Sequence, residues 1–409
     1  MGSSTVAKLL ATAAIPLAIP AGALAQTGAA HHRSAHAGRS SACGRQHKRG
    51  CSSSHHKTSR FRARSSAVPT PHVSARPALS PAAPGSTSTT SSSAAPSIPP
   101  ITPTIAPVLA ITGTTYYVSP AGSDSNSGKS PNAPWRTVKR VNEASLRPGD
   151  GVLFQGGATF SDDTLMPQVS GTAGSPIVFG SYGQGNATLP EGIWFRGESF
   201  LAFEHLTVTG AGNLQGTGSN VTVEYCSIGN DSLPIDAMGS NWTIDDNTVE
   251  NAGNSGMLLE GENFTVSGNT IANTGLDTSI TYGKHGIYLK VSNATVTGNT
   301  ITNFSDDGIS VRYRNSVLRG NHISDGPIGI AWFQVDATGG TSYWTDNAIS
   351  ATSDAGIYVS GENSAQNGGS GSTRESFVIE RNLIAPSCGG HMNLEATSGS
   401  YATSENSLV

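Results

Sequence analysis

The stretch Phe264-Thr-Val-Ser-Gly-Asn269-Thr-Ile271 is followed, after a loop, by Gly286-Ile-Tyr-Leu289. The same order of residues returns as Ala294-Thr-Val-Thr-Gly-Asn299-Thr-Ile301 and then Gly308-Ile-Ser-Val311. Each unit reads apolar-x-apolar, two residues, Asn, one residue, Ile or Val, a variable loop, and Gly-apolar-x-apolar. Because alternate residues of a strand point to opposite faces, this pattern predicts short strands with one buried face.

The repeated asparagine measures the period of these units. It occurs at Asn247, Asn269, Asn299, Asn321, Asn347, Asn382 and Asn406, with steps of 22, 30, 22, 26, 35 and 24 residues. No hairpin turn closes at that spacing, whereas a coil of a parallel β-helix has this length. We therefore expect the asparagines to stack amide on amide at a bend, in left-handed backbone geometry, as structural residues and not as ligands.

The segment before the repeats supports this interpretation and suggests a family. It contains Tyr116-Tyr-Val-Ser-Pro-Ala-Gly-Ser-Asp124, Pro134-Trp-Arg-Thr-Val-Lys-Arg-Val141 and Arg147-Pro-Gly-Asp150. Together with the coils, it resembles the pectate-lyase-like superfamily. That resemblance implies an all-β fold, a right-handed parallel β-helix (solenoid) of about ten coils over residues 113–409, and an extracellular polysaccharide as ligand.

The two ends of the expected solenoid differ. Asn132 can cap a short helix with Pro134 in its first turn, and Trp135, Val138 and Val141 form its apolar face. We expect this N-terminal capping helix to close the core. The chain stops inside a coil, at residues 404–409, so that end is a truncated coil or a surface for self-association.

The N-terminal residues predict export. Lys8, an apolar run over residues 9–19 and Ala23-Leu-Ala25 form a secretory signal peptide over residues 1–25. The run is shorter than the ~20 residues of a membrane-spanning helix, so we expect no transmembrane segment. The protein is accordingly expected to be secreted, extracellular or associated with the cell wall.

Residues 26–112 form a low-complexity linker that is basic at first and then rich in Pro, Ser and Thr. Too few apolar residues are present to offset conformational entropy, which predicts disorder. The whole chain has 24 Lys and Arg and 28 Asp and Glu; 11 of the cations and none of the acids precede residue 113, which leaves 13 − 28 = −15 for the expected fold. An acidic fold argues against nucleic acid as the main partner.

Four cysteines are too few for a disulfide scaffold. Cys43 and Cys51 lie in the linker and could close a small loop. Cys226 and Cys388 belong to coils too far apart to bond at ~4.8 Å for each coil. We expect both of them to be buried apolar side chains.

One outward position of each Gly-apolar-x-apolar strand falls in register along the stack, at Glu260, Lys290, Arg312, Phe333 and Ser360. Neighbouring coils are ~4.8 Å apart, so Lys290 and Arg312 should project side by side. Two cations repel unless an anion bridges them. The row therefore predicts an anion-binding site, in a stretch that also holds Lys284, Arg314 and Arg319.

Further polar residues stand beside this row. Lys284-His285 and Asp306-Asp307 precede two of the strands, one coil apart, and Tyr288 and Tyr313 can stack on sugar rings. A loop insertion over residues 272–283 could wall one side of a groove. The predicted substrate-binding residues are Glu260, Lys284, Tyr288, Asp306, Asp307, Tyr313 and Arg314. In the alternative interpretation, these charges pair with one another as a solvated ladder.

Lys290, Asn299 and Arg312 resemble in spacing the Lys and Arg pair of polysaccharide lyase family 6, the alginate lyase and chondroitinase B group. The resemblance implies that Lys290 removes the proton alpha to a uronate carboxylate, and that Arg312 helps to protonate the leaving oxygen or holds the anion. His285 completes the candidate catalytic set. That family holds Ca²⁺ near the lysine, but Lys284 and His285 stand there, so Ca²⁺ stays an open cofactor and the metal ligands are unknown.

Two classes of function follow. One is a lyase that acts on an acidic polysaccharide or cell-wall glycan by β-elimination; the other is a non-catalytic cell-surface or adhesin-like module. Polygalacturonase-like glycosidases have Asp pairs before a Gly-His-Gly, and the order here is reversed, with His285 ahead of Asp306 and Asp307. The Asp-Pro-His motif of alginate epimerases is absent from the sequence. Paired carboxylates for hydrolysis stay open in principle.

Overall fold

The computed structural model describes residues 109–409, except 211–212, 282, 334–338, 362–373, 387, 389, 396 and 398. The expected signal peptide, nearly all of the linker, Cys43 and Cys51 therefore lie outside the described residues. Where the linker meets the fold, Leu109 N–H donates to Glu204 Oε1 and Thr112 N–H donates to Gly149 O. No helix of the described part is long and apolar enough to cross a membrane.

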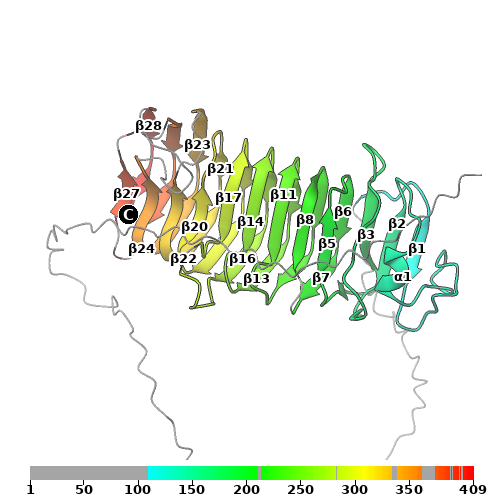
Figure 1. Cartoon of the computed structure of the whole chain (residues 1–409). Helices are drawn as coiled ribbons and strands as arrows, with labels where there is room; N and C mark the ends of the chain where they lie inside the picture. Colours follow the sequence, from blue (N-terminus) through cyan, green and yellow to red (C-terminus); the bar gives the residue numbers. More distant parts are fainter. Residues whose placement is uncertain are drawn as a thin grey trace, which may run out of the picture. The chain divides into compact units, whose positions relative to one another are not determined.

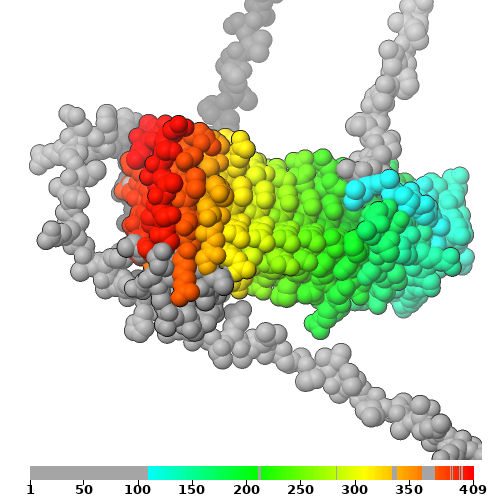
Figure 2. All heavy atoms as spheres, turned by 90° about the horizontal axis from the view of Figure 1, so that it is seen from above, coloured from blue at the N-terminus to red at the C-terminus, as the bar shows by residue number. Residues whose placement is uncertain are grey.

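The described chain is a right-handed parallel β-helix of about ten coils, as predicted (Figure 1). Its strands form one sheet of 12 and one of 17 strands, and all the sheet pairings are parallel. By these pairings the larger sheet divides into two rows of strands, so each coil contributes to three faces. Figure 2 shows the coils following one another in chain order.

Face 1 is the 12-stranded sheet and holds the strand before each repeated asparagine. Its strands are β1 Thr115–Val118, β2 Gly151–Gln155, β3 Ile177–Tyr182, β6 Leu201–Glu204, β9 Val221–Glu224, β12 Thr243–Asp245, β15 Thr265–Ser267, β18 Thr295–Thr297, β21 Val317–Arg319, β23 Thr341–Thr345, β25 Ser376–Glu380 and β28 Tyr401–Ser404.

Face 2 follows the asparagine. Its strands are β4 Ala187–Thr188, β7 Leu206–Thr209, β10 Ser227–Gly229, β13 Thr248–Ala252, β16 Thr270–Thr274, β19 Thr300–Phe304, the first parts of β22 His322–Trp332 and β24 Ala348–Val359, β26 Leu383–Ala385 and β29 Ser407–Leu408.

Face 3 carries the Gly-apolar-x-apolar strands and the predicted site. Its strands are β5 Ile193–Arg196, β8 Leu214–Ser219, β11 Ile235–Ser240, β14 Met257–Glu262, β17 Ile287–Ser292, β20 Asp307–Val311, the later parts of β22 and β24, and β27 Gly390–Leu394.

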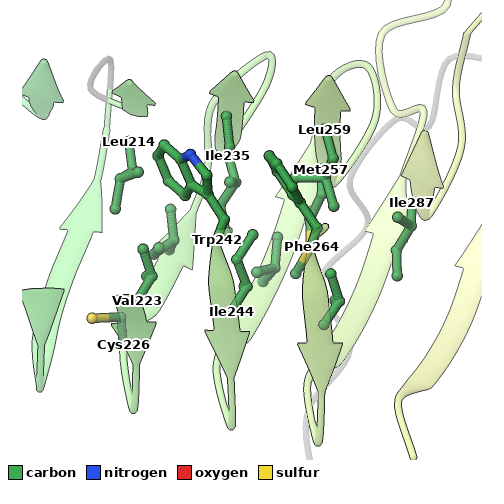
Figure 3. Close-up of a cluster of buried hydrophobic side chains, with 14 of the residues drawn as sticks. Leu214, Val223, Cys226, Ile235, Trp242, Ile244, Met257, Leu259, Phe264 and Ile287 are labelled. Carbon is green, nitrogen blue, oxygen red and sulfur yellow. The ribbon is translucent and has the colours of Figure 1, made fainter. Parts of the chain in front are cut away.

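Inward side chains of the three faces stack into one continuous core (Figure 3). The ring of Trp242 lies 5.8 Å from Phe195 and 6.0 Å from Phe264, centroid to centroid, and all three side chains are buried. Such stacks add to the hydrophobic stabilisation of each coil on the next. Cys226 is buried here as a free thiol, as predicted, and burial raises its pKa to about 12.

The repeated asparagines form the expected internal ladder. Nδ2 of Asn269 donates to Oδ1 of Asn299 at 2.9 Å, and Nδ2 of Asn299 donates to Oδ1 of Asn321 at 3.0 Å. Their backbone geometry was predicted wrongly, because the left-handed residue is the one before the asparagine, such as Gly268 (φ 66°) or Gly298 (φ 65°). The asparagine is free to turn inward because its predecessor makes the bend.

Two further asparagine ladders run along the outside of the coils. One of them joins Asn220, Asn241, Asn263, Asn293 and Asn315, where each Nδ2 donates to the preceding Oδ1 at 2.9 to 3.3 Å. All five residues have a positive φ between 56° and 60°. The Asn-x-Thr triplets at the first four of these positions therefore recur because the turn requires left-handed backbone geometry.

The short helix near the start of the fold is α1, Val138–Asn142, and its cap differs from the prediction. Thr137, and not Asn132, is the N-cap, and its side chain accepts the N–H of Arg140. Trp135 precedes the helix and forms a parallel bridge with Val118, so it is buried as part of the first coil. Val138 and Val141 join the core cluster as expected; closure of the core by this helix stays a prediction.

Cys388 corrects a second expectation. It is exposed and disulfide-bonded, so its interpretation as a buried apolar side chain was wrong. The error arose because Cys388 was assigned to the interior of a coil, whereas it lies between β26 and β27. Self-association through the last coil stays a prediction.

Candidate functional site

The hydrogen-bond register of face 3 confirms the predicted row as far as Phe333, whereas Ser360, expected to point outward, is buried. Glu260 pairs with Lys290 between β14 and β17. One residue beyond the paired part of β20, the N–H of Arg312 donates to Leu289 O at 2.9 Å, and in the next coil Phe333 N–H donates to Val311 O at 3.0 Å. Lys290, Arg312 and Phe333 therefore follow one another on successive coils, because each coil repeats the same pairing.

Lys290 forms an ion pair with its neighbour in the row. Its Nζ lies 2.6 Å from Oε1 of Glu260, and both side chains are about 30% exposed. The same Nζ lies 4.9 Å from the centre of the Tyr288 ring. Lys290 therefore has one acidic and one aromatic neighbour on the surface of face 3.

Arg312 is held by aromatic rings on both sides. Its guanidinium carbon lies 5.0 Å from the centre of the Tyr288 ring and 4.6 Å from that of Phe333. Among the described residues it has no ion pair, and its buried Nε has no hydrogen-bond partner. A guanidinium fixed by rings and without an acidic partner is suited to bind a carboxylate from outside.

His285, Asp306 and Asp307 come together at the corner where the chain joins face 3. Nδ1 of His285 lies 3.2 Å from Oδ2 of Asp307 and 3.6 Å from Oδ2 of Asp306. The His285 ring lies 4.7 Å from the Tyr288 ring, centroid to centroid. This corner cluster therefore adjoins the row of Lys290 and Arg312 through Tyr288.

Asp236 is a charged neighbour that the sequence did not indicate. It lies on β11, accepts a hydrogen bond from Gln215 Nε2 at 2.9 Å, and pairs in register with Leu258. Burial raises its pKa, and the charge of Glu260 adds to the increase, while the bond from Gln215 and the charge of Lys290 oppose it. It was missed because β11 begins without the glycine that marks the other strands.

Three predicted members lie on loops beside the row. Lys284 ends the inserted loop, and Tyr313 and Arg314 follow β20; all three are half-buried. No described contact joins Lys284 or Tyr313 to Lys290 or Arg312. Arg319 does not belong to the predicted anion-binding site, because it lies on face 1. Its Nε is 3.3 Å from Oδ2 of Asp346 there.

Two features near the row also differ from expectation. Residues 272–274 belong to β16, so the inserted loop begins only at Gly275. A shallow hollow of about 780 Å³ lies along β21 and β23 of face 1, where Val317 and Tyr343 are among its lining residues. None of the predicted site residues lines it, so we do not assign the hollow to the site.

The charges around Lys290 do not form a calcium site. Ca²⁺ takes six to eight oxygen ligands. Glu260 is paired with Lys290, and the described residues gather only one group of three metal-binding side chains, in which His285 supplies nitrogen. We therefore derive no step of a reaction through Ca²⁺.

Comparison with known families agrees with the observed coils. The model of the right-handed β-helix region matches residues 186–281 and 264–408, which together exceed half of the chain. The chain belongs to the right-handed β-helix family. This match confirms the right-handed β-helix that the sequence predicts.

The β-helix is also similar to carbohydrate-active proteins. A lacto-N-biosidase of Bifidobacterium longum is 43% identical over 83 residues, which cover 19% of this chain and only 5% of that relative. The alignment with a solved glycoside hydrolase covers 72% of this chain and 97% of the hydrolase chain, at a TM-score of 0.52 and 9% identity. The alignment with a mannuronic acid-specific polysaccharide family 6 lyase from human gut microbiota covers 73% of this chain and 82% of the lyase chain, at a TM-score of 0.48 and 17% identity. At these identities the structural similarities show the fold alone.

Proposed function

We propose that this β-helix is a secreted protein that binds an acidic, uronate-containing polysaccharide on face 3 and cleaves it by β-elimination. The observation that carries the proposal is the position of Lys290 and Arg312, which approach the ring of Tyr288 from adjacent coils at 4.9 Å and 5.0 Å. A guanidinium that neutralises a carboxylate lowers the cost of removing the proton on the carbon beside it, and Lys290 lies one coil away as the base for that proton.

Each residue has a distinct part in the proposed reaction. Arg312 holds the uronate carboxylate, because its guanidinium is fixed between two rings. Lys290, once separated from Glu260 and deprotonated, takes the proton alpha to the carboxylate. The electron pair of that C–H bond forms the new C=C bond, and the bond to the glycosidic oxygen breaks. Tyr288 supplies a proton to the leaving oxygen.

The test is an assay of the purified chain with alginate, pectate, chondroitin and dermatan, with and without Ca²⁺. The unsaturated uronate product is followed by its ultraviolet absorbance. We expect product from at least one polymer and a rate loss of ~10² to 10⁴ in Lys290→Ala. Tyr288→Phe should lower kcat while leaving polymer binding nearly unchanged, and Arg319→Ala is the matched control. Absence of product from every polymer would contradict the lyase.

A non-catalytic module is the second candidate, and the ion pair between Lys290 and Glu260 favours it. A lysine that is already paired serves as a binding cation and not as a base. Saturable binding of a polymer without any product would support this alternative. A chromogenic lacto-N-bioside is included because of the similarity to lacto-N-biosidase. Release of its chromophore would show hydrolysis, which neither candidate function predicts.

A further inference from the structure

The corner cluster of His285, Asp306 and Asp307 supports an inference that is independent of the proposed reaction. His285 precedes β17, and Asp306 and Asp307 stand at the start of β20, the next strand of face 3. Their ligand atoms all lie within 4.8 Å of one another. We propose that these three side chains bind a divalent transition metal ion of the Zn²⁺ or Mn²⁺ type.

The distances suit a shared ion. Ligand atoms that lie ~2.0–2.2 Å from one metal are roughly 3 to 3.5 Å from each other. Nδ1 of His285 is 3.2 Å and 3.6 Å from the Oδ2 atoms of Asp307 and Asp306. Asp306, whose side chain is 45% exposed, lies on the solvent side of this group.

Nδ1 of His285 makes two close contacts with Asp307. The N–H of Asp307 donates to Nδ1 at 3.3 Å, which requires a lone pair on that nitrogen. The same Nδ1 lies 3.2 Å from a carboxylate oxygen of Asp307, so two acceptor atoms stand close together. A cation at this position attracts the lone pairs of the imidazole and of the carboxylates together, in place of the long N–H contact.

The second observation is an unpartnered oxygen on Asp307. This side chain is 2% exposed, and its Oδ1 has no hydrogen-bond partner within the described part of the chain. A buried carboxylate oxygen without a partner is costly. A metal ion bound by the same carboxylate offsets that cost, and Asp306 leaves a path to solvent.

The donor set selects the class of metal. One imidazole nitrogen and two carboxylates are typical ligands of Zn²⁺ and Mn²⁺, whereas Ca²⁺ prefers oxygen atoms alone and more of them. The ion would join two successive coils and lie beside Tyr288, whose ring contacts His285. It would therefore stiffen the edge of face 3 even if the proposed lyase activity were absent.

The experiment is a calorimetric titration of the full chain, freed of metal with a chelator, with Mn²⁺, Zn²⁺ and Ca²⁺ in turn. Seven of the 11 histidines precede residue 109, so the measured quantity is the difference between variants and the parent chain. We expect Asp307→Asn and His285→Ala each to lose one equivalent of Mn²⁺ or Zn²⁺, or to bind it at least about tenfold more weakly. Co²⁺ in the parent site should give a visible absorption band that His285→Ala lacks.

Asp354→Asn is the matched control. Asp354 precedes Ala355, which occupies the position of Asp307 two coils further along, and it is exposed. Its substitution should leave metal binding unchanged. Circular dichroism checks the fold of each variant, and Asp306→Asn, at a half-exposed side chain, decides the matter if the buried substitutions unfold the protein. Equal stoichiometry and affinity in the parent chain and in Asp306→Asn and Asp307→Asn, or a preference for Ca²⁺, would overturn the proposal.

Discussion

Nζ of Lys290 lies 2.6 Å from Oε1 of Glu260, between two strands that are paired in register at these very residues. This ion pair therefore lies on one side of the Tyr288 ring. On the other side, Arg312 has aromatic neighbours and no acidic partner among the described residues. The two cations of the site thus differ in how readily each can bind an anion.

Glu260→Gln should strengthen the binding of a polyanion. The substitution removes the negative charge that occupies Lys290, so the lysine becomes available to a carboxylate. We expect a gain of up to about fivefold in affinity for the best polymer, because an exposed ion pair is worth about 0.2 to 1 kcal/mol. Binding is measured by affinity electrophoresis at low salt. Glu262→Gln, an exposed position on the same strand, should have no such effect.

Arg312→Ala should weaken polyanion binding at least about tenfold, since a charge-assisted hydrogen bond contributes about 1.5 to 3 kcal/mol. Arg312→Lys should recover only part of the loss, because a lysine cannot be held flat between Tyr288 and Phe333. Arg319→Ala removes a cation on face 1 that is already paired with Asp346, so the affinity should not change. Equal losses in Arg312→Ala and Arg319→Ala would show a diffuse charge effect and no site on face 3.

Glu224→Gln should make stability less dependent on pH. Burial raises the pKa of Glu224 to about 7, and Glu204, Asp245 and Asp246 add like charge. The folded state then holds a proton that the unfolded state has lost, so stability is full below about pH 4.5 and falls as the pH rises through about 7. At pH 8 we expect the variant to be more stable by about 1–2 kcal/mol, after allowance for screening.

Urea denaturation at pH 4 and at pH 8 measures this effect, with Glu250→Gln at an exposed position of β13 as the control. A parent protein whose stability does not fall between these pH values would contradict the expected proton uptake at Glu224.

Asn299→Ala should destabilise the β-helix by about 2–4 kcal/mol. Oδ1 of Asn299 accepts the backbone N–H and the Nδ2 of Asn269, both at 2.9 Å, so the substitution leaves the buried N–H without an acceptor and removes one of the acceptors of Nδ2. Asn293→Gly in the outer ladder should cost less than about 1 kcal/mol, because glycine adopts the same positive φ and solvent replaces the amide. Urea midpoints of the two variants give the comparison, and similar values would contradict the distinction between buried and exposed ladders.

The sequence by itself determined the coil, its period and the outward row of Glu260, Lys290 and Arg312. This was readable because a parallel β-helix repeats one pairing in every coil, so neighbours in space are found by counting from Asn269 to Asn299. It also placed His285 one coil from Asp307. The bend before each asparagine was misplaced by one residue, because Asn and Gly both adopt a positive φ and the pattern does not distinguish them.

The tertiary structure alone decided which of these neighbours interact. The register places Lys290 beside Glu260, but only the side-chain positions show that the two form an ion pair, that Arg312 lies against Tyr288 and Phe333, and that an oxygen of Asp307 is buried without a described partner. The exposure of Cys388, between β26 and β27, was likewise not indicated by the repeat. The pairing of strands follows from a sequence pattern that repeats in every coil. These side-chain contacts depend instead on distances between residues of different coils, which the repeat does not specify.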